Sequence, residues 1–153
     1  MLEVRGFTIK NVRHPEGREG YGLLCDIFYK GKKVGSCEDY GMGSVSNVYI
    51  DAEYKELFQQ AQDAFYAQFP QLANDRYDDD TFVTHLDALK EDLRVYKQKA
   101  KLGYPCLVRV AYQDWSENYC WAKTRAAIDN YVKTKTSVDK VFIYTSENDF
   151  KVA

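Results

Sequence analysis

Apolar and polar side chains alternate along residues 20–39, and a lysine–glycine pair interrupts the alternation near its middle. Leu23, Cys25 and Ile27 share one face of the first arm. A period of two is typical of a half-buried strand, and Lys30-Gly31 is a turn signal between two such runs. The segment therefore predicts a β-hairpin.

The register of this hairpin decides where two cysteines lie. A two-residue turn pairs Tyr29 with Lys32 and Cys25 with Ser36, which places Cys25 and Cys37 on opposite faces of the hairpin. A three-residue loop would instead place the two cysteines directly opposite each other. The sequence leaves both registers open, and with them the pairing of these two thiols.

Shorter alternating runs predict the remaining strands. The first strand runs from Leu2 to Val12 with a bend at Gly6, and a loop over Pro15–Gly20 follows it. Further strands are expected at Val48–Ile50, at Cys106–Tyr112, around Tyr119–Trp121 and at Val141–Tyr144. The strand at 106–112 and the run after it form a second hairpin.

Three segments have the three- and four-residue spacing of helices. Asp51 is a good N-cap for the first helix, which ends near Gln68 because Pro70 restricts the residue before it. Thr124 caps a short third helix with Ile128 on its buried side. The second helix is the most regular, with one apolar face made of Phe82, Leu86, Leu89, Leu93, Tyr96 and Ala100.

The charges at the ends of the second helix fit its dipole. Asp78, Asp79 and Asp80 lie in the first turn, where the helix dipole is positive, and Lys99 lies in the last turn, where it is negative. Gly103 then supplies a stop signal.

Strands that are grouped at one end of the chain and joined by hairpins predict an α+β fold. We expect a mainly antiparallel sheet with about three helices packed on one face. A chain of 153 residues is the size of one ordinary domain and buries about two thirds of its unfolded surface. We therefore expect a single domain over residues 1–153.

Charge and cysteine content narrow the classes of function. The 21 basic and 23 acidic side chains nearly cancel, so binding to a polyanion would need a local basic patch. No apolar run approaches the roughly 18 residues of a membrane span, and we expect no membrane contact. The four cysteines come without an export signal or a CxxC motif, so we expect reduced core thiols and a cytoplasmic location.

An acidic cluster is the first candidate site; its members are Asp75, Asp78, Asp79 and Asp80. Oxygen ligands suit magnesium or calcium, but the glycine and the final glutamate of a calcium loop are missing, so no metal site is predicted. The cluster is interpreted either as a helix start that serves the dipole or as an acidic surface that faces a partner protein.

Basic side chains form the second candidate site. Lys90, Arg94, Lys97 and Lys101 make one stripe along the second helix, and Lys30, Lys32 and Lys33 surround the hairpin turn. Such side chains can contact phosphates, or they can be the solvated flank of a structural helix.

Candidate catalytic and ligand-binding residues are few. The glycine-rich segment 39–44 can present backbone amides to a phosphate, but it lies between two strands and lacks a following Gly-Lys-Ser or Gly-Lys-Thr. His14 and His85 are the only histidines, so no zinc site or histidine-dependent triad is predicted, and pairing of His85 with a Cys120 nucleophile would depend on the fold. We predict no catalytic residue, no metal and no cofactor.

Several short motifs carry a resemblance to a known group. They are Gly17–Gly22, Tyr29–Gly35 and Asp39–Gly43, followed by Lys97–Lys101, Cys106–Val110, Trp121–Lys123 and Ile128–Lys133. In these motifs the chain resembles small accessory proteins carried by phages and other mobile elements of bacteria. Residues 39–43 depart from the Asp-x-Gly/Ala-Asn-Gly-Gly form of that group.

The resemblance implies a role in the cytoplasm of a bacterial host. Small mobile-element proteins without enzyme motifs often occupy a host defence protein, as an anti-CRISPR-like inhibitor does. We therefore expect a non-enzymatic protein that binds a host or defence-system protein stoichiometrically, through the acidic cluster and through exposed members of its 13 tyrosines. The alternative is a nucleic-acid or nucleotide-binding protein that uses the basic side chains. An enzyme with a cysteine or aspartate nucleophile is a third hypothesis.

Overall fold

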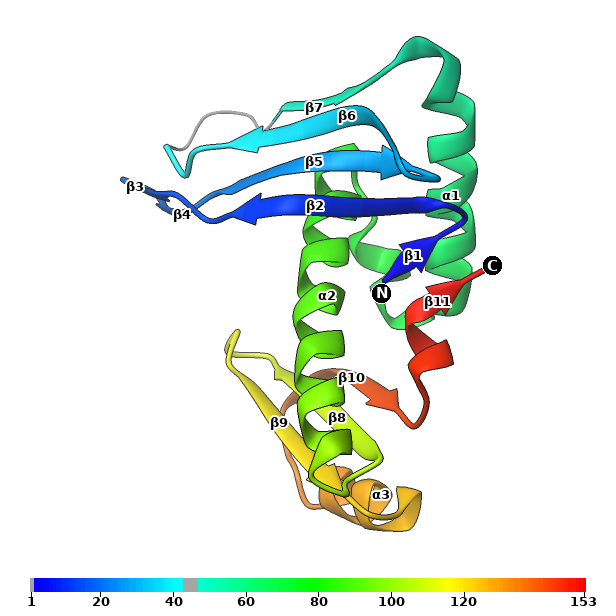
Figure 1. Ribbon diagram of the computed structural model, residues 1–153. Coiled ribbons are helices and arrows are strands. Elements are labelled where there is room, and N and C mark those ends of the chain that lie inside the picture. The colour runs from blue at the N-terminus through cyan, green and yellow to red at the C-terminus, as the bar shows by residue number, and fades with distance from the viewer. Residues whose placement is uncertain (1, 43–46) are drawn as a thin grey trace. The chain divides into compact units, whose positions relative to one another are not determined.

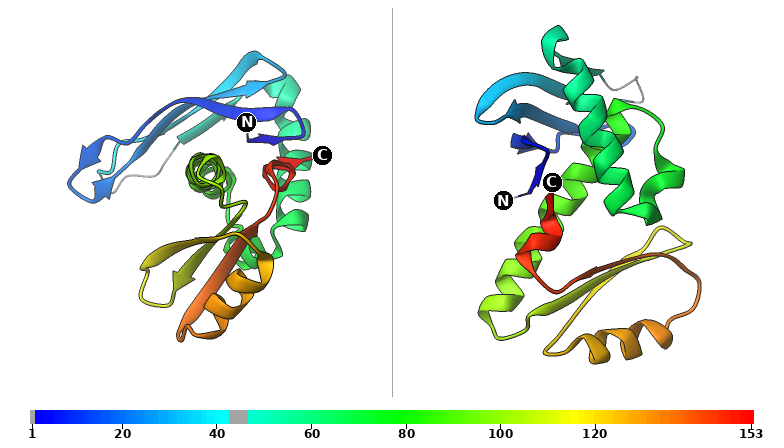
Figure 2. Two further views of the ribbon diagram at one scale, coloured as in Figure 1. Left: turned by 60° about the horizontal axis from the view of Figure 1, so that its bottom comes forward. Right: turned by 90° about the vertical axis from the view of Figure 1, so that its right-hand side faces the viewer.

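The computed structural model describes residues 2–42 and 47–153, and the chain divides into two compact units. The first unit comprises residues 2–89 together with Val152–Ala153, and the second unit comprises residues 90–151. Figures 1 and 2 show the elements of both units. The long helix α2 (Asp79–Lys101) begins in the first unit and ends in the second.

A six-stranded sheet forms most of the first unit, in the order β11-β1-β2-β5-β6-β7. Its strands are β1 (Glu3–Val4), β2 (Phe7–Arg13), β5 (Leu23–Tyr29), β6 (Lys32–Asp39), β7 (Asn47–Ile50) and β11 (Lys151–Val152). A separate two-stranded ribbon consists of β3 (Glu16–Gly17) and β4 (Gly20–Tyr21). This ribbon occupies the predicted loop over 15–20.

Helices cover one face of the six-stranded sheet. A short 3-10 helix, Ala52–Tyr54, leads into α1 (Lys55–Gln68), and a second 3-10 helix, Pro70–Asp75, follows. The Phe58 ring of α1 lies 5.2 Å from that of Phe7 on the sheet and 5.3 Å from that of Phe82 in α2. These buried rings fix α1 and the start of α2 against the same side of the sheet (Figure 1).

The first predicted strand is a hairpin, not a bent strand. Val4 pairs with Phe7 across a two-residue turn. Both turn residues have left-handed backbone, with φ of 47° at Arg5 and 88° at Gly6. Two residues of positive φ match the twist of the flanking strands, so the chain reverses where a bend was expected.

The β5–β6 hairpin has the two-residue turn that the sequence predicts. Tyr29 pairs with Lys32, and both turn residues, Lys30 and Gly31, have positive φ of 47° and 85°. This is the backbone of a tight hairpin turn.

Beyond the turn, a β-bulge changes the predicted register. Ile27 pairs with Gly35 because Val34 is an extra residue on β6, and its side chain is buried. The bulge shifts every later pair by one residue, so Cys25 lies opposite Cys37 and not opposite Ser36. The turn is the two-residue alternative, but the expectation that such a turn pairs Cys25 with Ser36 is wrong.

The second unit contains a three-stranded sheet in the order β10-β8-β9. Its strands are β8 (Cys106–Tyr112), β9 (Glu117–Ala122) and β10 (Val138–Tyr144). Helix α3 (Arg125–Lys133) buries Ile128 against Cys106, Val108 and Val110 of the central strand. Thr124 caps α3 as predicted, because its hydroxyl oxygen accepts a 3.2 Å hydrogen bond from Ala127 N.

The opposite face of β8 contacts α2. Arg109 of β8 and Tyr144 of β10 both hydrogen bond to Asp92 of α2. The central strand is therefore buried on both faces, since helices contact both sides of this sheet.

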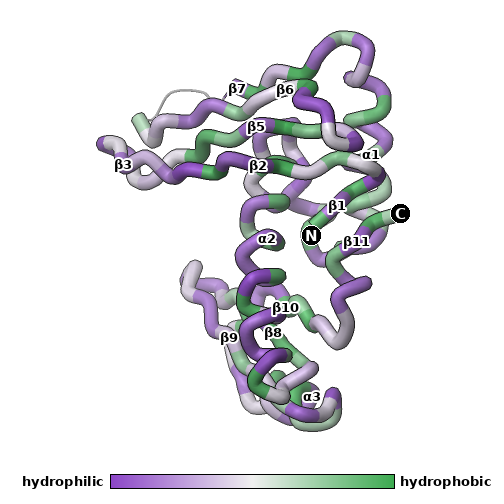
Figure 3. The backbone as a smooth tube through the Cα atoms, in the orientation of Figure 1, coloured by the Kyte–Doolittle hydropathy of each residue, from purple (hydrophilic) through white to green (hydrophobic). Residues whose placement is uncertain are grey.

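The predicted α+β class, with three main helices and mostly antiparallel strands, is confirmed. Helix α1 ends at Gln68 as expected, and Leu86, Leu89 and Leu93 of α2 are buried. Figure 3 shows hydrophobic and hydrophilic stretches alternating along α2. Asp51 does not act as a side-chain cap; its backbone carbonyl accepts from Tyr54 N instead.

The strands are divided between separate sheets, and the prediction of a single domain over residues 1–153 stays a prediction. None of the helices in residues 2–42 and 47–153 is long and apolar enough to cross a membrane.

Candidate functional site

The acidic cluster surrounds the start of α2, and part of it serves the helix. Asp78 Oδ1 accepts hydrogen bonds from the backbone N and the hydroxyl of Thr81, at 2.8 and 2.9 Å. Asp78 is therefore the N-cap of α2. Asp80 is half-buried, and its Oδ1 lies 3.8 Å from Sγ of Cys37.

The other two acidic residues differ in exposure. Asp75 is half-buried at the end of the second 3-10 helix. Asp79 is exposed, and its Oδ1 accepts a 2.6 Å hydrogen bond from Nε2 of the buried Gln62 in α1. That bond holds one carboxylate oxygen in place while the group faces solvent.

An exposed aromatic side chain adjoins the acidic residues. Tyr77 is 78% exposed and directly precedes Asp78 and Asp79, which are both exposed. We call these three residues the acidic surface. Tyrosine next to charged side chains is typical of protein-binding surfaces, since tyrosine supplies apolar area and a hydroxyl at low entropic cost.

A groove lies beside the acidic surface in the first unit. It has a volume of about 310 Å³. Its lining residues come from β7, α1 and the first turn of α2 and are Val48, Ile50, Lys55, Phe58, Gln59 and Asp79. We call it the edge groove. Asp79 thus belongs both to the acidic surface and to the edge groove, in which Val48, Ile50 and Phe58 are the apolar members.

The basic stripe of α2 lies in the second unit, and one of its side chains, Arg94, forms an ion pair there. Arg94 hydrogen bonds to both carboxylate oxygens of Glu91, and this ion pair raises the pKa of Arg94. Lys97 is half-buried, whereas Lys90 and Lys101 are exposed.

The hairpin lysines of the first unit contact neighbouring side chains. Lys33 forms a 3.1 Å ion pair with Asp26. The ammonium groups of Lys30 and Lys32 lie 5.4 and 5.5 Å from the ring centres of Tyr29 and Tyr54. The structure thus places the two predicted basic groups in different units, and it gives each group local partners.

Charge is distributed unequally between the units. Residues 2–89 carry 15 acidic against 9 basic side chains, a net charge of −6, and residues 90–151 carry 8 against 12, a net charge of +4. The overall charge of −2 therefore conceals an acidic first unit and a basic second unit.

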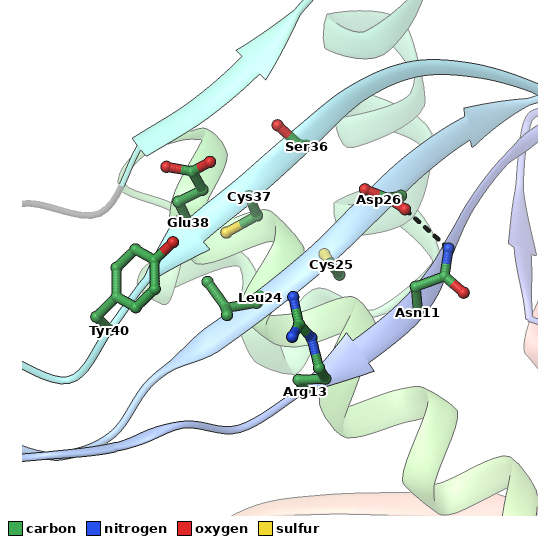
Figure 4. Close-up of a pocket in the computed structure, with 9 residues that line it drawn as sticks. All are labelled: Asn11, Arg13, Leu24, Cys25, Asp26, Ser36, Cys37, Glu38 and Tyr40. Carbon is green, nitrogen blue, oxygen red and sulfur yellow. Dashed lines mark hydrogen bonds between the residues drawn. The ribbon is translucent and has the colours of Figure 1, made fainter.

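The open face of the six-stranded sheet has a small polar pocket of about 120 Å³ (Figure 4). Its lining residues are Asn11, Arg13, Leu24, Cys25, Asp26, Ser36, Cys37, Glu38 and Tyr40. Asn11 Nδ2 donates a 2.8 Å hydrogen bond to Asp26, and this bond together with Lys33 lowers the pKa of Asp26. Because carboxylates of Asp26 and Glu38 share this pocket with Arg13, it does not favour an anion.

Two residues that line this pocket, Cys25 and Cys37, form a coupled thiol pair. Cys25 and Cys37 are free, buried and directly opposite each other. The thiol hydrogen of Cys37 lowers the pKa of Cys25, and the same hydrogen bond, with burial, raises the pKa of Cys37. Sequence reasoning left this pairing open and attributed it to a three-residue loop, because the bulge at Val34 has no composition signal.

Both histidines contact neighbouring side chains in the first unit. His14 Nε2 lies 2.7 Å from Asp87 Oδ2, and His85 Nδ1 lies 2.9 Å from the hydroxyl oxygen of Tyr66. Burial raises the pKa of Cys120, which is opposite to the change that activates a nucleophilic thiol. The hypothesis of a Cys120–His85 nucleophile pair gains no support from these environments.

A buried ionic cluster in the second unit was not expected from the sequence. Asp92 is fully buried and accepts hydrogen bonds from Arg109 Nε at 2.9 Å and from the hydroxyls of Tyr119 and Tyr144 at 2.6 Å. Burial opposes the charge of Arg109, but Asp92 outweighs it and raises the pKa of Arg109. Three donors to one carboxylate without solvent access make this a structural cluster. In the sequence, the only sign of this cluster is the position of Asp92, a charged residue beside the apolar face of α2.

The glycine-rich segment after β6 packs against the β3–β4 ribbon. A side chain at Gly22 would collide with the carbonyl of Asp39, and one at Gly41 would collide with the carbonyl of Gly20. Gly41 N donates to Asp39 Oδ1, and Gly41 O accepts from Glu19 N. These glycines therefore serve close backbone packing, while Gly43 and Ser44 of the predicted loop lie outside the described residues.

No group of three or more histidine, cysteine, aspartate or glutamate side chains in the described ranges could hold a metal ion. Comparison with protein-family models, with curated proteins and with solved structures finds no match to this chain. The assignment of a function consequently depends on the chemistry of the chain itself.

Proposed function

We propose that this protein is a non-enzymatic accessory protein of a phage or bacterial mobile element that binds a host or defence-system protein stoichiometrically. The acidic surface of Tyr77, Asp78 and Asp79 is the contact. The resemblance described above supplies the biological setting of this proposal, and the side chains of the first unit supply the binding chemistry.

One observation carries the proposal: the exposed acidic surface shares Asp79 with a groove that is lined in part by apolar side chains. Tyr77 is 78% exposed, and Asp79 lines the edge groove with Phe58 and Ile50. Protein interfaces combine an apolar centre with a polar rim, and charges on the rim guide the encounter with a partner of opposite charge. The net charge of −6 on the first unit favours a basic partner surface in the same way.

The test is affinity capture from a bacterial host with the full chain and with a matched double variant, Asp78→Asn with Asp79→Asn. Asparagine caps a helix as well as aspartate does, and its Oδ1 can still accept from Gln62. The variant therefore removes two charges and keeps both hydrogen-bond acceptors.

We expect one host protein to be enriched by the full chain at a fixed molar ratio and to be depleted with the double variant. Circular dichroism and thermal unfolding are the control, since each lost charge at the helix start costs only about 0.3–1 kcal/mol. Capture that is unchanged by the double variant would remove the acidic surface from the proposal.

A second candidate function is nucleic-acid binding by the second unit, which the net charge of +4 on residues 90–151 favours. Binding to phosphates weakens steeply as salt rises, because counterions are released. Titration of a fluorescent oligonucleotide at several salt concentrations therefore separates this function from protein binding.

A further inference from the structure

Strand β7 is the terminal strand of the six-stranded sheet and pairs on one side with β6. Asp51 N donates to Val34 O across these two strands at 2.8 Å. Backbone groups of an antiparallel strand face its two sides alternately. Tyr49 therefore faces β6 as Asp51 does, and the backbone groups of Val48 and Ile50 face away from the sheet.

These outward backbone groups have no backbone partner among residues 2–42 and 47–153. An edge strand with unpaired N–H and C=O groups is a template for another extended chain. The edge thus specifies the conformation of what binds there, because only an extended segment matches its hydrogen-bonding pattern.

The edge groove lies on one face of this edge. Val48 and Ile50 are half-buried and form its sheet wall, and the buried ring of Phe58 also lines it. A strand added beside β7 would place its own side chains about 4.5–5.5 Å from those of β7 on the same face. An aliphatic side chain of that strand would therefore enter the groove.

Charge specifies a second position of the added strand. Asp79 lines the groove on the α2 side and Lys55 on the α1 side, and Asp78, next to Asp79, is exposed. The bond from Gln62 occupies Oδ1 of Asp79, and this carboxylate can accept further hydrogen bonds. A lysine or arginine two residues from the aliphatic residue lies on the same face of the added strand and can meet these carboxylates.

We propose that β7 binds an extended segment of the partner protein as an additional strand, with an aliphatic and a basic side chain directed to the edge groove. This inference rests on the proposed function and names the chemistry of the partner. A second copy of the chain is a poorer occupant, since pairing of two β7 edges would bring two acidic surfaces into one interface.

The experiment uses isotopically labelled full-length protein and the synthetic peptide acetyl-Thr-Ile-Thr-Lys-Thr-amide, whose isoleucine and lysine share one face. Amide hydrogen exchange is followed by NMR. We expect slower exchange at Val48 and Ile50 when the peptide is added, and no change at Tyr49, whose amide already faces β6.

Two control peptides separate the contributions. The peptide with glutamate in place of lysine should bind roughly two- to fivefold more weakly, the range of one exposed ion pair. The peptide with a methylated backbone nitrogen at isoleucine should give no protection at Val48 and Ile50, because it cannot complete the ladder. Equal protection by all three peptides, or protection by none, would overturn strand addition.

The outcomes also separate this inference from the proposed function. If the host protein is captured by the full chain and lost with the acidic double variant, but the peptides leave Val48 and Ile50 unprotected, protein binding stands and strand addition fails. If the peptides protect these amides and no host protein is captured, strand addition stands and the proposed function fails. Protection that grows with protein concentration alone would show self-pairing of β7 and overturn the partner assignment.

Discussion

At the scale of residues, the coupled thiols of Cys25 and Cys37 have the most distinctive environment. The thiol of Cys37 donates to Cys25, lowers its pKa and has its own pKa raised. The bulge at Val34 is the cause, because it brings the two side chains to the same face of the sheet.

The first prediction tests this coupling. In a background with Cys106→Ser and Cys120→Ser, the variant Cys37→Ala removes the donor while the burial of Cys25 persists. We expect the pKa of Cys25 to rise, since burial favours the neutral thiol once the hydrogen bond is lost. Alkylation rates as a function of pH provide the measurement, and an unchanged profile would refute the coupling.

The redox state of the thiols is a separate prediction. Protein purified under reducing conditions should contain four free thiols, because all four cysteines are unpaired in the structure. A Cys25–Cys37 bridge in material taken directly from cells would contradict it, and mass spectrometry of trapped thiols decides the matter.

The second residue-scale environment is that of Tyr66, whose pKa burial raises to about 12 from an ordinary value of 10.0. Between these values the unfolded chain loses the phenol proton while the folded protein keeps it. Stability from this group is therefore fully present below pH 10 and is lost as pH rises toward about 12.

The matched variant for this prediction is Tyr66→Phe, which keeps the ring and removes the titrating hydroxyl. We expect its free energy of unfolding to fall less steeply than that of the parent protein between pH 10 and 12. Other tyrosines with raised pKa contribute to both proteins, so the difference between the two curves is the quantity to compare. Parallel curves would show that Tyr66 does not titrate as described.

At the scale of elements, α2 is the element that is predicted best from the sequence. Its apolar positions recur over five successive steps from Phe82 to Ala100, and the structure buries Leu86, Leu89 and Leu93. Helix periodicity is a local signal, since each turn repeats the same geometry. The strands and the Thr124 cap were predictable for the same reason.

The unpredicted features depend on contacts that are distant in the sequence. The bulge at Val34 is one, since local alternation fits either register. The buried pair of Asp92 and Arg109 is another, because each residue interrupts an apolar segment and only the fold brings them together. The edge groove, likewise, joins β7, α1 and α2, which no single run of residues reveals.

The third prediction concerns the packing of α2. Leu89 is fully buried, so Leu89→Ala should lower the free energy of unfolding by roughly 2–5 kcal/mol. Lys90→Ala, at the next and exposed position, is the matched control and should change it by less than about 0.5 kcal/mol. Chemical denaturation of the three proteins gives the comparison, and an unchanged midpoint for Leu89→Ala would remove this residue from the core.

At the scale of the whole molecule, the near-zero total charge is the sum of two opposite contributions. The first unit has a net charge of −6 and contains the acidic surface, whereas the second unit has +4 and contains the basic stripe. The acidic surface and the basic stripe of α2 therefore lie in different units. Charge substitutions can test the two hypotheses independently within the same chain.

The last prediction compares the two sets of charges in one capture experiment. Asp78→Asn with Asp79→Asn should weaken binding of the captured protein roughly two- to thirtyfold, because each exposed ion pair contributes about 0.2–1 kcal/mol. The triple variant Lys90→Glu, Arg94→Glu and Lys97→Glu should leave that binding nearly unchanged. Arg94 already pairs with Glu91, so its reversal costs some helix stability, which thermal unfolding will report.

The opposite result has an equally definite meaning. If the triple variant abolishes binding and also removes salt-dependent affinity for an oligonucleotide, recognition belongs to the second unit and nucleic acid is the partner. The acidic residues then serve only the start of α2, as the bonds from Thr81 to Asp78 already show that one of them does. Because the two sets of variants lie in different units, loss of binding in one set alone assigns the recognition surface to that unit.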